Sequence, residues 1–204
     1  MPQHASGLAF VRRGIVQPVV RIVQRTCIAI LPAIAATRLA AQDMEVPVAV
    51  QIPLFLKVIS FDRHHAADQP LVFGIVFQSG YRASVEAKNE ALLAIAAVAP
   101  AAPAVRPVAI DLDRESLPNA LGGQRFSVVY VTPVRAISIG DIAAATSAAR
   151  VTTFTGVPRF VALGLAVGVR LQGERPRLLI NLPAARASGA DFSAELLKLA
   201  QVTP

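Results

Sequence analysis

Cysteine, tryptophan and tyrosine are scarce in this sequence of 204 residues, which has one, none and two of them. The single cysteine, Cys27, excludes a disulfide framework within one chain and a zinc site built from several cysteines. So few tyrosines and tryptophans argue against base stacking on nucleic acid as the main activity. Charged residues make up only 16% of the chain and hydrophobic residues 54%, which excludes an intrinsically disordered protein.

Acidic residues are absent from the first 41 residues, which contain five arginines. The whole chain has 20 basic and 13 acidic side chains, a formal charge of +7, but beyond residue 41 the counts are 15 and 13. A nucleic-acid-binding domain is expected to be basic in its folded part. The excess charge therefore belongs to a terminal segment, and we expect no nucleic-acid partner.

That terminal segment has the order of a secretory signal peptide. A basic region precedes the apolar run Cys27–Ala36, which is far shorter than the ~20 residues that span a bilayer. Small residues follow, and we expect cleavage after Ala41, or alternatively after Ala35. A start codon further downstream, an uncleaved anchor and a mitochondrial presequence remain open alternatives. The sequence predicts a signal peptide over residues 1–41 and one domain over residues 42–204.

Strand and helix patterns alternate along the predicted domain. Leu71–Gln78 and Phe126–Val131 are continuously apolar and suit strands that are buried on both faces. Further strands are predicted over 107–112 and 151–155, with a hairpin of 165–171 and 178–182 and a turn at Gly122-Gly123. These patterns predict an α/β fold: one layered domain with a mixed, mainly parallel sheet flanked by helices, a closing β-hairpin and a C-terminal helix.

Helices are predicted over 46–62, 81–95, 139–150 and 193–200, with a short alanine-rich helix before the last. Ser138 precedes the third helix as an N-cap, with Asp141 three residues later. Pro53 interrupts the first helix and is a possible break. Helical spacing assigns the buried faces of the first two helices. These faces are Leu54, Lys57, Val58 and Phe61 in the first helix, and Tyr81, Val85, Lys88, Leu92 and Ile95 in the second.

Chemical motifs are few. The sequence has no G-x-S-x-G elbow and no glycine-rich phosphate loop. His64-His65, with Asp62 and Asp68 nearby, is interpreted as a solvated loop, because adjacent residues on an extended chain point to opposite sides and cannot easily share an ion. Asp111 and Asp113 could hold a cation or act as an acid/base pair, but a charged loop is the simpler interpretation. We expect no metal, no cofactor and no catalytic residue.

Ligands of open α/β sheets gather at the carboxyl ends of the strands. In this sequence those ends carry hydroxyl groups, glycines and two arginines, beside Gln78. The candidate ligand-binding or partner-binding residues are Ser79, Gly80, Thr132, Arg135, Thr155 and Arg159.

The last thirty residues contain a block of the form I-N-x-x-A-A-x-x-x-G-x-x-x-S-x-x-L-L-x-L-A, which resembles the C-terminal block of the YfiR-like family. Asn181 is expected to cap the short helix through the amide of Ala184, and Gly189 to follow that helix. A ligand site at Asn181 is the alternative. The block is expected to be chiefly structural, with leucines 196, 197 and 199 packing the last helix on the sheet. The matching positions are Ile180, Asn181, Ala184, Ala185, Gly189, Ser193, Leu196, Leu197, Leu199 and Ala200.

This resemblance implies a periplasmic α/β protein that acts as a dimer. Named members of the family repress a membrane diguanylate cyclase and hold down cyclic di-GMP until an outer-membrane partner sequesters them. Two features differ from the family: Phe55–Asp62 lacks the tryptophan of the usual F-x-x-W-P motif, and cleavage would remove the only cysteine, so disulfide control cannot operate.

The expected function is a non-enzymatic periplasmic regulator that binds the periplasmic part of a membrane diguanylate cyclase as a homodimer. The alternatives are a periplasmic small-molecule-binding protein that uses the strand-end crevice, and a small hydrolase.

Overall fold

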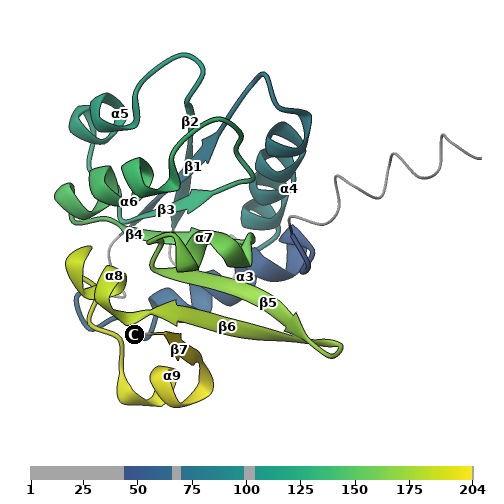
Figure 1. Cartoon of the computed structure of the whole chain (residues 1–204), viewed down its shortest axis with the longest axis vertical. Helices are drawn as coiled ribbons and strands as arrows, with labels where there is room; N and C mark the ends of the chain where they lie inside the picture. The colour runs from purple at the N-terminus through teal and green to yellow at the C-terminus, as the bar shows by residue number, and fades with distance from the viewer. Residues whose placement is uncertain (1–43, 66–69, 99–103, 204) are drawn as a thin grey trace, which may run out of the picture. The chain divides into compact units, whose positions relative to one another are not determined.

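The computed structural model describes residues 44–65, 70–98 and 104–203 (Figure 1). The predicted signal peptide lies outside these residues, and its cleavage stays a prediction. No helix in the described ranges has both the length and the hydropathy needed to cross a bilayer. The described elements, in chain order, are α3 (Val48–Ile59), β1 (Leu71–Phe77), α4 (Arg82–Val98), β2 (Val105–Asp111), α5 (Leu117–Gly123), β3 (Val128–Val131), α6 (Ile139–Ala148), β4 (Thr152–Thr155), α7 (Pro158–Ala162), β5 (Val167–Gln172), β6 (Arg175–Asn181), α8 (Leu182–Ala187), α9 (Ala194–Leu199) and β7 (Gln201–Thr203).

The described strands form one sheet in the order β2-β1-β3-β4-β5-β6-β7. Neighbouring strands from β2 to β5 are parallel, β6 runs antiparallel to β5, and β7 runs parallel to β6. The predicted α/β fold with a mixed, mainly parallel sheet is therefore confirmed, including the hairpin of β5 and β6. The carboxyl ends of β1 to β4 lie together on one side of the sheet, and their amino ends lie on the opposite side. We call these two rows of strand ends the carboxyl edge and the amino edge; neither term refers to an edge strand.

Helices cover both faces of the sheet. Ile75 and Tyr130 face one core, shared with α3 and α4, whereas Val76 and Val129 face a second core, shared with α5, α6 and α7. Neighbouring residues of a strand point to opposite faces, so a strand between two helical layers must be apolar throughout. This arrangement accounts for the continuous apolar runs in β1 and β3.

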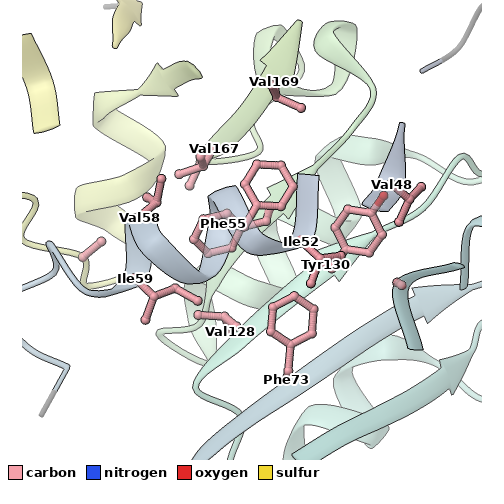
Figure 2. Close-up of a cluster of buried hydrophobic side chains, with 14 of the residues drawn as sticks. Val48, Ile52, Phe55, Val58, Ile59, Phe73, Val128, Tyr130, Val167 and Val169 are labelled. Carbon is pink, nitrogen blue, oxygen red and sulfur yellow. The ribbon is translucent and has the colours of Figure 1, made fainter. Parts of the chain in front are cut away.

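The first helix of the described ranges, α3, packs on the sheet through a face that differs from the predicted one (Figure 2). Phe55 packs on the Phe154 ring at 5.1 Å between ring centroids, and the helix continues through Pro53 without a break. An internal proline costs about 3 kcal/mol, which packing of the apolar face outweighs. Of the predicted face only Val58 is buried. The buried residues are Val48, Gln51, Ile52, Phe55, Val58 and Ile59.

The buried face of α4 also differs from the prediction, because small residues rather than large ones point inward. Alanines 87, 91 and 94 are buried, and Leu93 is 71% exposed. Helix α4 packs on both α3 and the sheet, and short side chains allow that close approach. Of the predicted stripe, only Ile95 is buried.

Three elements were not predicted. Gly122 and Gly123 end helix α5 instead of forming an isolated turn. Pro158 is the first residue of α7, where its missing N–H is harmless. Strand β7 has only three residues, too few for a periodic pattern.

Candidate functional site

The turn that follows β1 is held at the carboxyl edge by two carboxylates. The backbone N–H of Ser79 donates to Asp111 Oδ1 at 3.1 Å, and that of Gly80 donates to Asp113 Oδ2 at 2.7 Å. The N–H of Asp113 also donates to Asp111 Oδ1, at 3.1 Å. Asp111 and Asp113 therefore fix the position of the Ser79-Gly80 turn, in agreement with a structural interpretation of this pair.

The electrostatics of Asp111 argue against a role as a general acid. Partial burial raises the pKa of this carboxyl, but hydrogen bonds from Ser79 and Asp113 and the charge of Arg114 outweigh burial, so the pKa lies below its usual range. The Arg114 guanidinium Nε lies 3.2 Å from Asp111 Oδ2. Asp111 is therefore ionised at neutral pH and has no proton to donate.

Gln78 ties the turn after β1 to the loop after β3. Its side-chain Nε2 donates to Asp113 Oδ1 at 3.2 Å, and its Oε1 accepts from the backbone N–H of Arg135 at 2.6 Å. The Arg135 guanidinium lies over the Tyr81 ring, 4.2 Å from its centroid, which is a cation–π contact. Ser79, Gly80 and Arg135 are exposed and share a rigid support.

Two of the predicted crevice residues are not accessible. Thr132 and Thr155 are fully buried. The Thr132 hydroxyl lies 2.6 Å from Ser84 Oγ and 2.9 Å from the carbonyl of Val76. The Thr155 hydroxyl donates to Val131 O at 3.0 Å and accepts from the N–H of Val157 at 3.1 Å. Both hydroxyls therefore hold strand ends together and cannot reach a ligand. Arg159, in α7, is exposed.

Residues of the C-terminal block cap the starts of helices α8 and α9 and terminate α8. Asn181 Oδ1 accepts from the N–H of Ala184 at 3.0 Å and so caps α8, as predicted, while Asn181 Nδ2 donates to the carbonyl of Val161 at 3.0 Å. Gly189 has a φ of +87° just after α8, a conformation that favours glycine. Ser193 caps α9 through the N–H of Leu196.

Packing of the last helix differs in one residue from the prediction. Leu196 is buried and Leu197 packs against the same core, but Leu199 is 65% exposed. Helix α9 ends at Leu199 and Ala200 is already extended, so Leu199 does not share the face of Leu196. Ala185 is fully buried in α8, and Ala184 packs against the same core.

A hollow of about 390 Å³ lies at the amino edge, on the side of the sheet away from the predicted crevice. His64 and His65 border it, together with Arg125 and Arg150. Residues 62–65 form a turn rather than the extended chain assumed in the sequence interpretation, and both histidines border the same hollow. Within the described ranges no group of three or more His, Cys, Asp or Glu side chains could hold a metal; Asp68 lies outside them.

The fold is similar to those of solved structures with little sequence identity. An ABC domain from Streptococcus pneumonia in complex with L-Trp matches with a TM-score of 0.56 at 13% identity, over 77% of this chain and 62% of that one. A conserved domain protein from Vibrio cholerae gives 0.55 at 14%, over 78% and 60%. A ligand-free, open substrate-binding protein with adhesive properties from Clostridium difficile gives 0.53 at 12%, over 78% and 60%. The chain thus spans about three fifths of the length of these structures.

Sequence comparisons identify the family directly. No curated protein matches the chain. A family profile described as YfiR/HmsC-like matches residues 55–201, from the middle of α3 into β7, and includes the C-terminal block. Because this match covers well over half of the 204 residues, the chain belongs to the YfiR/HmsC-like family.

Proposed function

We propose that this protein is a non-enzymatic regulator that binds the periplasmic part of a membrane diguanylate cyclase and limits cyclic di-GMP synthesis. The family match over residues 55–201 carries the proposal, because at the level of the family these proteins are periplasmic regulators of diguanylate cyclase signalling. The hydrogen bond from the N–H of Ser79 to Asp111 is consistent with a structural role for this carboxylate.

The carboxyl edge is the surface that we assign to the partner. Ser79, Gly80, Arg135 and Arg159 are exposed on it, and hydrogen bonds to carboxylates and to Gln78 fix its loops. A surface that is already rigid loses little conformational entropy on binding. Arg135 presents an exposed guanidinium on this edge, so we expect an acidic group of the partner opposite it.

Copurification from detergent-solubilised envelopes tests this proposal. A tagged copy of the full chain should recover a membrane diguanylate cyclase, identified by mass spectrometry. Arg135→Glu should reduce recovery at least roughly tenfold, because reversing a charge at a complementary interface adds repulsion. Arg106→Glu, which changes an exposed arginine near the amino end of β2, is the matched control and should leave recovery unchanged.

Recovery of no cyclase with the unmodified chain would contradict the proposed function. Recovery that Arg135→Glu leaves intact would keep the function and move the partner surface away from the carboxyl edge. The resemblance also leads us to propose a cleaved, homodimeric form. Edman sequencing of the envelope form should begin between residues 36 and 43, and light scattering should give twice the mass of the processed chain.

A further inference from the structure

The hollow at the amino edge is bordered by the starts of several strands and by two helix ends. Residues before β3 and β4 line it, as do His64, His65 and the residues that follow α8. Two adjoining parts of the hollow, of about 370 and 390 Å³, share His64, Arg125, Phe126, Arg150 and Gly189. Volumes of this size are typical of small-molecule sites.

Two arginines border the hollow. Arg125 and Arg150 are exposed, and neither pairs with a carboxylate in the described part of the chain. Among the described residues that border the hollow, Asp62 is the carboxylate, and its Oδ1 already accepts from the backbone N–H groups of His64 and Asp191 at 3.1 and 3.0 Å. Two guanidinium groups that pair with no carboxylate of the described ranges favour an anion.

Polar side chains with unused hydrogen-bonding capacity lie among the residues that line the hollow. Ser127 Oγ accepts from the N–H of Val72 at 3.1 Å, which leaves the Ser127 hydroxyl proton for another acceptor. His65 Nε2 is buried and has no hydrogen-bond partner in the described structure. His64 Nδ1 lies 3.0 Å from the carbonyl of Gly189, so the His64 ring is held at the rim.

The backbone at Arg150 gives an independent indication. Helix α6 ends with the N–H of Val151 bonded to Thr146 O at 2.9 Å and that of Arg150 bonded to Ser147 O at 3.0 Å. This pattern places Arg150 at the position after the helix cap, with a φ of +55°, where glycine is the usual residue. Helix α8 ends with the same pattern and has the usual residue there, Gly189.

Gly189 also leaves room for the arginine. A β-carbon on Gly189 would lie 3.3 Å from Arg150 Nη2 and 3.4 Å from Arg150 Nε. Arg150 thus adopts an unfavourable backbone conformation at the hollow. The absence of a side chain on Gly189 allows the Arg150 guanidinium to lie close to the Gly189 backbone. Strained residues of this kind gather at ligand sites, where the side chain compensates for the strain.

We propose that this hollow binds a small ligand through an oxyanion, a carboxylate or a phosphate monoester, held by Arg125 and Arg150 with the Ser127 hydroxyl. The site is distinct from the carboxyl edge assigned to the cyclase, so it would give the regulator a second, small-molecule input. A guanidinium can donate two parallel hydrogen bonds to either oxyanion.

Calorimetric titration of the protein purified from envelopes tests the site, with inorganic phosphate and succinate as separate probes and chloride at matched ionic strength as the blank. Saturable binding of phosphate alone would identify a phosphate ligand, and of succinate alone a carboxylate; binding of both would support the shared oxyanion chemistry. Arg150→Gly and Arg150→Gln should weaken binding roughly ten- to a hundredfold, the loss expected for hydrogen bonds to a charged group.

Ala136→Gly is the matched control, because Ala136 is exposed at the carboxyl edge and has a φ of +54°. This substitution relieves the same backbone strain as Arg150→Gly but lies outside the hollow, so it should leave binding unchanged. Arg150→Gly should unfold at a temperature no lower than the unmodified protein, since glycine suits this conformation. Absence of saturable binding by either probe, or equal binding by all variants, would overturn the proposal. Lower stability of both Arg150 variants with intact binding would also overturn it, because Arg150 would then only stabilise the end of helix α6.

Discussion

Replacing Asn181 by alanine separates a structural role of the C-terminal block from a role in partner binding. The side chain makes two bonds, accepting from the N–H of Ala184 and donating to the carbonyl of Val161. Loss of an N-cap costs ~0.5–2 kcal/mol, and loss of a neutral hydrogen bond ~0.5–1.5 kcal/mol. The carbonyl of Val161 keeps the N–H of Gly164 as a donor, at 3.2 Å, so no buried acceptor is left without a partner.

The expected loss is therefore about 1–3.5 kcal/mol, out of a total stability of about 5–15 kcal/mol. In a domain of this size that lowers the melting temperature by roughly 2–14 °C. Urea unfolding with an unchanged m-value would measure it. Asn181→Ser keeps a capping oxygen and loses the donor to Val161, so it should fall between the alanine variant and the unmodified protein.

Copurification of the cyclase at low temperature provides the second half of this test. The alanine variant that remains folded should still recover the cyclase. Full stability combined with lost recovery would refute the reasoning, because it would make the block an interaction site rather than a scaffold.

Three further substitutions test the fold. Leu196→Ala should cost ~2–5 kcal/mol in urea unfolding because Leu196 is buried, whereas Leu199→Ala in the same helix should be close to neutral; equal effects would contradict the assigned face of α9. Asp111→Asn should destabilise the protein at neutral pH, because folding lowers the pKa of this carboxyl and so favours its ionised form. That stabilisation is complete above the unfolded pKa of about 3.9 and is lost as pH falls through the folded pKa. A variant that is equally destabilised in acid would exclude the charge as the cause. Gly156→Ala should lower the melting temperature, since a β-carbon there would overlap the buried amide of Gln51; an unchanged melting temperature would show that the amide moves freely.

Local signals in the sequence were sufficient for much of the fold. The apolar run of β1 and the caps at Ser138 and Asn181 depend on neighbouring residues, and the structure has all three. Tertiary contacts decided the rest. Which face of α4 is buried depends on its approach to α3, which favoured alanines over the larger residues that helical spacing marked.

The hollow could not be predicted from the sequence, because it too depends on tertiary contacts. Arg125 and Arg150 precede strands β3 and β4, and the histidines are some sixty residues earlier in the chain, so only the parallel sheet brings them together. Whether the predicted crevice binds anything stays a prediction. The structure joins its two sides through Gln78, whose side chain accepts from the N–H of Arg135, and it buries Thr132, which strand-end position alone could not reveal.

Cyclic di-GMP in cells that lack this protein is the most direct test of the proposed regulation. Deletion of the gene, with every cyclase still present, should raise the nucleotide level and thicken biofilm, and a plasmid copy of the unmodified chain should restore both. A nucleotide level that deletion leaves unchanged would contradict the account.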